Sequence, residues 1–155
     1  MELVFEVPFA FLAAAGFAVL FYAPKKCLMA SGCIGAFGWI VNRLLGMLDI
    51  PMIVTVFIAA IVVAAASEWM ARYYKTPVTV FAISAIVPLV PGSLAYSTMY
   101  SLAEGNYYDG VTLGSKTFLV AGSIAAGLVF VGAIARTIKY RSGQHVAESI
   151  VDYKK

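Results

Sequence analysis

The sequence has few charged residues, few cysteines and almost no histidine. Charged residues make up 12% of the 155 positions, whereas soluble domains carry about a quarter. Hydrophobic residues make up 62%, and the mean hydropathy is +0.89. The charges lie in short clusters between long apolar runs. This pattern excludes a soluble domain and predicts an all-α protein that crosses a membrane several times.

The scarcity of cysteine and histidine argues against a metal or redox centre. Cys27 and Cys33 are six residues apart in an apolar run, so they lie on different faces of a helix. We interpret them as small packing residues, with a metal or redox role as the alternative. His145 lies in a polar tail without cysteines or carboxylates at ligand spacing. We expect no metal, no cofactor and, since the apolar runs contain no catalytic dyad or triad, no enzymatic activity.

Five apolar runs are long enough to span a bilayer, and they fill most of the chain. The predicted spans are 3–22, 27–45, 50–71, 78–103 and 117–135. They form one membrane domain, 1–136, followed by a polar tail, 137–155, which we expect to be a short helix or disordered. The first run has no basic residue before it, so we expect it to stay in the mature protein rather than act as a signal peptide.

The positions of the basic residues predict the orientation of these spans. With the N-terminus outside, nine basic residues fall in the cytoplasmic loops and tail, and two fall outside. The nine are Lys25, Lys26, Arg72, Lys75, Arg136, Lys139, Arg141, Lys154 and Lys155. The two are Arg43 and Lys116. Because cytoplasmic loops are enriched in lysine and arginine, the N-terminus is predicted outside and the C-terminus inside. The net charge of +3 is explained by this placement and does not call for a nucleic-acid partner.

The second run carries small residues at regular spacing and ends in a polar pair. Gly32, Gly35 and Gly38 recur every third residue, a pattern that lets helices approach closely in lipid. Asn42 and Arg43 follow near the end of the run. We interpret this pair as an anchor at the membrane interface. The alternative is a charge that faces an anionic solute.

Acidic residues near the later spans are few. Glu68 and Arg72 are four residues apart, so a local ion pair is expected, with a proton relay through Glu68 as the alternative. Glu104 and Asp109 are the other acids in this part of the chain. Each has an interfacial position in the predicted topology.

The fourth run, 78–103, is interrupted in its middle by Pro88, Pro91 and Gly92. As a continuous helix its 26 residues would extend about 39 Å at 1.5 Å per residue. A bilayer core is about 30 Å thick, so the break falls near the middle of the membrane. Each proline removes a backbone donor, and Pro91 is expected to free the carbonyl of Val87. Irregular backbone at this depth requires surrounding protein or a water-filled cavity.

The break predicts a site for an anionic group. With Pro91 at the first helical position, the amides of Gly92, Ser93 and Leu94 would be unpaired at a new helix start. A helix N-terminus binds carboxylates, and carriers with discontinuous helices use such ends near the midplane.

Polar residues after the break share one face of the helix. They lie at offsets 0, 3, 4, 7, 8 and 11 and are Ser93, Tyr96, Ser97, Tyr100, Ser101 and Glu104. This hydroxyl stripe suits a small polar solute, because hydroxyls both donate and accept hydrogen bonds. We predict substrate binding by Pro91, Gly92, Ser93, Tyr96 and Ser97. The pathway is predicted to continue along Tyr100, Ser101 and Glu104. The alternative is that the stripe bonds to neighbouring helices and holds the bundle together.

The segment SAIVPLVPGSLAYSTMYSL, residues 84–102, resembles the signature of the threonine/serine exporter family. It is most similar to the small-subunit form, which has a P-hh-PG motif in its fourth span. Lys75, Thr76 and Pro77 before it, and the glycines of the second run, also resemble that form. The motif carries over to Pro88, Pro91 and Gly92, with Ser93 as an adjacent candidate.

The resemblance implies export of small amino acids or related carboxylates, such as threonine, serine or succinate, across the bacterial cytoplasmic membrane. It also implies a larger membrane subunit as partner, which single-chain members fuse to the small one in about ten spans. A half that starts outside would then form an inverted pair with a half that starts inside. We expect proton-coupled alternating access. The alternatives are a structural subunit that completes the partner's fold and a homo-oligomeric channel.

Overall fold

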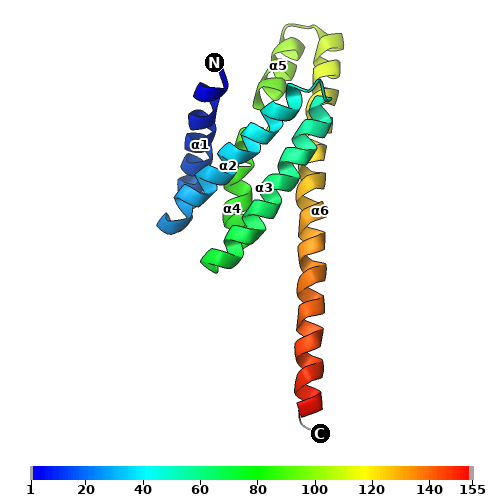
Figure 1. Ribbon diagram of the computed structural model, residues 1–155. Helices are drawn as coiled ribbons and strands as arrows, with labels where there is room; N and C mark the ends of the chain where they lie inside the picture. The colour runs from blue at the N-terminus through cyan, green and yellow to red at the C-terminus, as the bar shows by residue number, and fades with distance from the viewer. Residues whose placement is uncertain (1, 154–155) are drawn as a thin grey trace.

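The structure, a computed structural model, describes residues 2–153, with side chains described over residues 5–137. Every regular element in this part of the chain is helical (Figure 1). The elements are α1 Glu2–Leu20, α2 Lys25–Gly46, α3 Met52–Tyr74, α4 Val78–Ala85, the 3₁₀ turn η1 Val87–Leu89, α5 Gly92–Ala103 and α6 Tyr107–Tyr153. The expected all-α class is confirmed.

Prolines mark where four of the helices begin. Pro24, Pro51, Pro77 and Pro91 stand immediately before α2, α3, α4 and α5. The fixed φ of proline suits a helix start, where the missing N–H would have no partner within the helix.

Four helices are followed by a residue in the left-handed conformation. These residues are Tyr22, Asp49, Lys75 and Gly105, with φ of 55°, 55°, 51° and 82°. At Lys75 the next amide, that of Thr76, donates to the carbonyl of Ala71 over 3.1 Å. This closure satisfies a carbonyl at the helix end and turns the chain back sharply. The helices on either side of each of these four turns run in opposite directions (Figure 1).

The helices provide three or four candidate membrane spans. α2, α3 and the part of α6 from Tyr107 to Thr137 are each long and apolar enough to cross. The pair Val78–Leu89 and Gly92–Ala103 counts as a fourth span, bent by 54° at the break. The described apolar part of α1, Phe5–Leu20, is shorter. An all-helical protein with several candidate spans and a break in the apolar run 78–103 is thus confirmed, whereas the five spans, with the broken run as the fourth and α1 as the first, stay a prediction.

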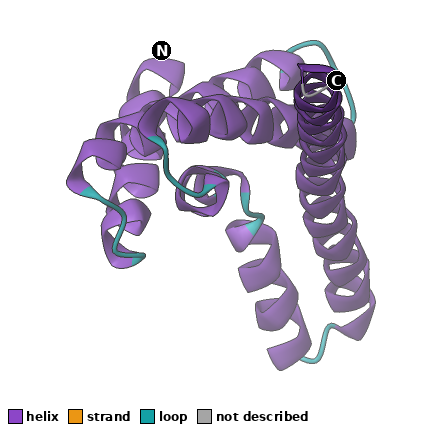
Figure 2. Cartoon of the chain, turned by 90° about the horizontal axis from the view of Figure 1, so that it is seen from below, coloured by secondary structure: helices purple, strands orange, loops and turns teal. Residues whose placement is uncertain are grey.

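α2 lies at the centre of the helix group and contacts α1, α3 and α4. α6 packs on α3 with one part of its length and on α5 with another. Figure 2 shows the hairpin of α5 and the start of α6 extending away from the group that α1–α4 form. The broken helix therefore begins inside the packed group and leaves it after the break.

Gly32, Gly35 and Gly38 of α2 allow its close contacts with three helices, as their spacing predicted. A Cβ added at Gly32 would lie 2.6 Å from Cε2 of Phe11 in α1. One added at Gly38 would overlap Cγ2 of Val63 in α3. At Gly35 an added Cβ would lie 2.5 Å from Cβ of Ala14 and 3.2 Å from the carbonyl oxygen of Ala85. Small residues thus set the spacing of α1, α3 and α4 around α2.

The core between these helices consists mainly of small side chains. Phe81, Val56 and Val63 are its largest fully buried residues. Cys27 is also fully buried, with its Sγ 3.9 Å from Oγ1 of Thr76, whereas Cys33 is exposed. The packing role is therefore correct for Cys27 but wrong for Cys33 within this chain, because Cys33 lies on the outer face of α2.

The loops alternate between the two ends of the structure. In Figure 1 the N-terminus and the α2–α3 and α5–α6 loops lie at one end. The α1–α2 and α3–α4 loops lie toward the other end, with Lys25 just after the first loop and Lys75 in the second, and the end of α6 lies there too. The backbone of α6 is helical to Tyr153. The described backbone of the tail is therefore helical, as one of the two alternatives had it, and it continues α6.

Replacing Gly35 by alanine is predicted to destabilise the protein. The new methyl group would meet Ala14 and the backbone of α4, neither of which can rotate away, and overpacking costs about 1–3 kcal/mol. Thermal unfolding in detergent measures the effect. Gly122→Ala in α6 is the control, because a Cβ there has nothing within 4 Å and alanine favours a helix. Equal melting temperatures for the two variants would contradict the packing assigned to α2.

Candidate functional site

The break in the fourth span consists of consecutive turns between α4 and α5. α4 ends at Ala85, η1 follows, and Val90 is extended before Pro91. The Val90 amide donates to the Val87 carbonyl over 3.1 Å, and the Gly92 amide donates to the Val90 carbonyl over 2.8 Å. With φ −76° and ψ 58°, Pro91 is the centre of an inverse γ-turn. The expectations that the Val87 carbonyl and the Gly92 amide would be unpaired are therefore wrong, because local turns satisfy both.

Two amides after the break have no backbone partner in the described chain. α5 begins at Gly92, one residue later than expected, with Pro91 as its cap. The Ala95 amide donates to the Pro91 carbonyl over 3.0 Å, and no turn or cap bond takes the amides of Ser93 and Leu94. α5 thus starts with two free donors beside the break. This arrangement can receive an anionic group.

The hydroxyl stripe of α5 is turned away from the rest of the chain. α5 packs on α6 through a different side, where Thr98 Oγ1 lies 3.4 Å from Thr117 Oγ1 and Leu102 lies against Gly110. On the stripe, Tyr96 is 70% exposed and Tyr100 is 53% exposed. Ser93 and Glu104 are also exposed, whereas Ser97 and Ser101 are half-buried, so most of the stripe forms an open face in this chain.

Within the described residues, the stripe does not join α5 to another helix by hydrogen bonds. The Tyr100 hydroxyl donates to Oε1 of Glu104 over 2.6 Å, one turn along the same helix. The rings of Tyr96 and Tyr100 stack with centroids 6.3 Å apart. Ser93, Ser97 and Ser101 make no side-chain hydrogen bond in the described structure. A stripe that holds this chain's own helices together is therefore not observed.

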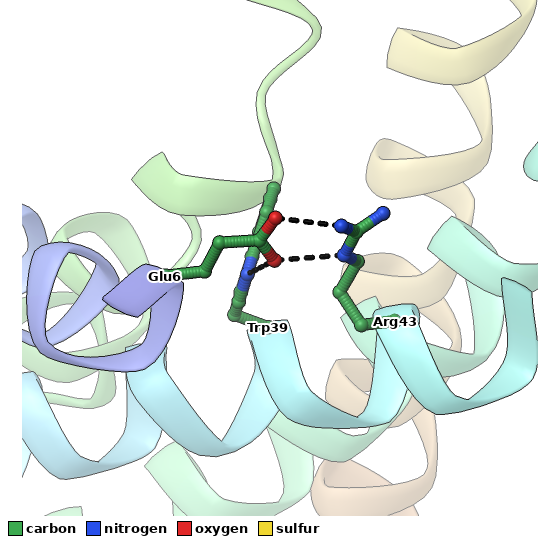
Figure 3. A network of polar contacts seen from close by, with 3 residues as sticks. All are labelled: Glu6, Trp39 and Arg43. Carbon is green, nitrogen blue, oxygen red and sulfur yellow. Dashed lines mark hydrogen bonds and ion pairs between the residues drawn. The ribbon is translucent and has the colours of Figure 1, made fainter. Parts of the chain in front are cut away.

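A second polar site joins α1 to α2 (Figure 3). The Arg43 guanidinium donates to both oxygens of Glu6, from Nε to Oε2 over 2.7 Å and from Nη2 to Oε1 over 2.6 Å. The Trp39 indole donates to the same Oε2 over 3.1 Å. The two-point pairing of a guanidinium with a carboxylate is the strongest geometry for such a contact. Glu6 is thus held by three hydrogen bonds from one face of α2.

Two open grooves adjoin this ion pair. The first has a volume of about 660 Å³ and is lined by Glu6, Trp39 and Pro88, together with apolar residues of α1. The second, about 440 Å³, is lined by Trp39, Asn42, Arg43 and polar or apolar residues from the start of α3. Because Pro88 belongs to η1, the Glu6 side of the ion pair and the broken helix line one groove.

Sequence reasoning missed the Glu6–Arg43 pair. The sequence predicts that Arg43 anchors at the interface or faces a solute, and it gives no partner for Glu6. A usable signal was present, because consecutive antiparallel spans place the start of one beside the end of the next. Opposite charges at those two positions predict a contact.

Glu68 and Asp109 have local partners. Glu68 lies 3.9 Å from Arg72 on the same helix, which confirms the expected ion pair. It also lines a crevice of about 220 Å³ between α3, α4 and α6. Asp109 accepts a hydrogen bond from the Asn106 side chain over 2.6 Å. A proton-relay role for Glu68 stays a prediction.

These features define a helical membrane protein with a discontinuous span and an ion pair beside the discontinuity. The family model of the threonine/serine exporter, ThrE, matches residues 6–134. The chain therefore belongs to the threonine/serine exporter (ThrE) family, as its P-hh-PG segment indicated. This is a transporter family and not a family of enzymes.

A curated relative is longer than this chain. An uncharacterized protein of Haemophilus influenzae is 25% identical over 142 residues, which cover 86% of this chain and 48% of that protein. The chain thus spans about half the length of the curated relative that it matches. No solved structure matches the chain.

Proposed function

We propose that this chain is one subunit of a secondary exporter for small carboxylate-bearing metabolites. Threonine, serine or a dicarboxylate such as succinate is the exported solute, and a proton gradient drives alternating access. The observation that carries the proposal is the break at Pro91, followed by two free amides, in a member of the threonine/serine exporter family.

The broken fourth span is the centre of the proposed mechanism. The solute carboxylate rests on the amides of Ser93 and Leu94, which are free in the described structure. Ser93, Tyr96 and Ser97 contact the other polar groups of the solute. The path then continues along Tyr100, Ser101 and Glu104 toward the outer surface. The 54° bend between the two half-helices provides the element that changes angle between the two access states.

The proposal includes five spans with the N-terminus outside. α1 has 19 residues, about 28 Å at 1.5 Å per residue, which is close to the thickness of a bilayer core of about 30 Å. It packs along α2, which is itself long enough to cross. The basic loops at one end of the bundle support a cytoplasmic location for that end. The membrane is the bacterial cytoplasmic membrane.

A larger membrane subunit of the same family completes the proposed carrier. Two observations support this partner: the chain aligns with only 48% of its longer relative, and the hydroxyl stripe on α5 is open. Hydroxyl groups left facing lipid are unfavourable unless they find hydrogen-bond partners. A second half would cover the stripe and enclose the pathway.

Two alternative roles make different predictions for reconstituted protein. A subunit that only completes its partner's fold would bind no solute, and variants of its stripe would leave export unchanged. A homo-oligomeric channel would conduct without saturation and without a partner.

Replacing Ser93 and Ser97 together by alanine is predicted to abolish most export while the assembly stays intact. The two hydroxyls make no bond within the chain, so their loss removes solute contacts and not packing. The measurement is efflux of radiolabelled serine and succinate from proteoliposomes that contain this chain and its co-expressed partner.

The matched control for this experiment is Ser115→Ala. Ser115 is exposed on α6 and its hydroxyl donates to the Val111 carbonyl of its own helix. Gel filtration of each variant measures assembly. If the double variant fails to assemble with the partner, the stripe is an interface and not a pathway. Unchanged export would also contradict the proposal.

The orientation gives a further prediction. Nine basic residues predict that the C-terminus lies in the cytoplasm. Of two reporters fused after Lys155, the one that works in the cytoplasm should therefore be active and the one that works outside should be inactive. Paired fusions of alkaline phosphatase and green fluorescent protein measure this directly. Phosphatase activity with a dark fluorescent fusion would place the C-terminus outside and refute the inverted-pair arrangement.

A further inference from the structure

The ion pair between Glu6 and Arg43 is not explained by the proposed role of the broken helix. Both residues lie in apolar helices, Glu6 near the start of α1 and Arg43 in the last turn of α2. Ionised side chains in such segments are unfavourable and usually mark a solute pathway or a proton path. The pair lies toward the end of the bundle where the chain begins (Figures 1 and 3).

The geometry of the pair is that of a carboxylate-binding site that holds an internal carboxylate. Arg43 offers two parallel N–H donors, and Glu6 fills both positions. The carboxylate of a small solute has the same two oxygens at the same spacing. The side chains are 38% and 28% exposed, so a solute that enters from the grooves can reach both charges.

An unpaired acceptor lies beside this pair. Oδ1 of Asn42 is buried and has no hydrogen-bond partner in the described structure. Asn42 adjoins Arg43 in the chain and lines the same groove. A buried acceptor without a donor is unfavourable. The second groove therefore combines a guanidinium with an amide acceptor, and the Glu6 carboxylate that Arg43 holds lines the first groove, so the two grooves together suit a ligand that brings donors.

The adjoining grooves have room for a metabolite. Ligand sites have volumes of about 300–1,000 Å³, and the grooves have about 660 and 440 Å³. Trp39 lines both grooves and donates to Glu6. Its indole lies where the ligand would enter, which makes it a natural reporter of binding.

We propose that Glu6 and Arg43 together form a second solute site, distinct from the amides of Ser93 and Leu94, at which a zwitterionic amino acid inserts between the two charges. The solute carboxylate takes the two donors of Arg43, and the solute ammonium donates to Glu6 and to Oδ1 of Asn42. When the solute separates Glu6 from Arg43, each of the two side chains gains an opposite charge of the solute as its new partner, so no charge is left uncompensated. This inference rests on the proposed export function and names the solute class.

The arrangement discriminates between the two solute classes that the export proposal allows. A dicarboxylate such as succinate would place its second carboxylate near Glu6, and like charges at close range repel. It would also bring no donor to Asn42. The site therefore favours an amino acid over a dicarboxylate.

The test is equilibrium binding of radiolabelled serine and radiolabelled succinate to the purified assembly of this chain and its partner. Two variants keep the size of the side chain they replace: Glu6→Gln removes the negative charge, and Arg43→Lys keeps the positive charge but loses the two-point fork. Arg72→Lys on α3 is the control for an arginine-to-lysine change, because Arg72 lies on α3, far along the chain from α1 and α2.

Wild type should bind serine more tightly than succinate. Both variants should weaken serine binding by about tenfold or more, since hydrogen bonds to charged groups contribute at least that factor. Glu6→Gln should also shift the serine-to-succinate affinity ratio toward succinate. A purely structural ion pair would change the melting temperature but not this ratio.

Several outcomes would overturn the inference, and they are distinguishable from failure of the export proposal. Normal serine binding and export by both variants would refute the binding site at Glu6 and Arg43 but would not contradict the export proposal. An assembly that binds and exports succinate but not serine would do the same. An assembly that neither binds nor exports either solute would overturn both.

A second measurement covers variants that fail to fold. The chain has two tryptophans, so a Trp69→Phe background leaves Trp39 as the only one. Serine should change the fluorescence of Trp39 in a saturable manner, because insertion separates Glu6 from Arg43 and disturbs the indole–carboxylate bond. Succinate should change it much less. No response to serine in a folded assembly that exports serine would contradict the proposal.

Discussion

Close contact at Gly35 is the constraint on which the rest of the structure depends. A Cβ at this position would meet Ala14 of α1 and the backbone of α4 at once. Gly32 and Gly38 repeat the arrangement toward α1 and α3. In lipid there is no hydrophobic drive between helices, so such packing provides much of their association. Because α4 is held against α2 in this way, the first half of the broken span is fixed in the helix group. The second half, α5, extends away from the group at an angle.

This division gives the fourth span two different environments. α4 and η1 contact α1, α2 and α3, whereas α5 packs on α6 and exposes its hydroxyl stripe. The break between them is closed by local turns at Val87, Val90 and Gly92, which leave two free amides at the start of α5. Beside it, Pro88 and the Glu6 carboxylate of the ion pair line one groove. One half of an alternating-access carrier requires a firmly packed part, here α4 and η1, and a polar face open to the other half, here α5.

The sequence predicted the helical class, the broken span and the close contacts of α2, because each follows from a local pattern of hydrophobicity, proline or glycine. It did not predict which backbone groups at the break pair with each other, since that depends on the conformation of Pro91. It also missed the ion pair, which joins residues 37 positions apart. Cys33 shows the same limit: residue type and an apolar run do not tell which face of a helix is covered.

We propose above all that this chain is one half of a carrier, and that the other half covers the open stripe of α5. The most direct measurement is purification of the tagged chain from its native membrane in mild detergent, followed by mass spectrometry and determination of stoichiometry. If this chain is one half of a carrier, a second multi-span protein of the same exporter family will co-purify with it at a fixed ratio. Recovery of only copies of this chain would contradict it and would replace the two-part carrier with a homo-oligomer.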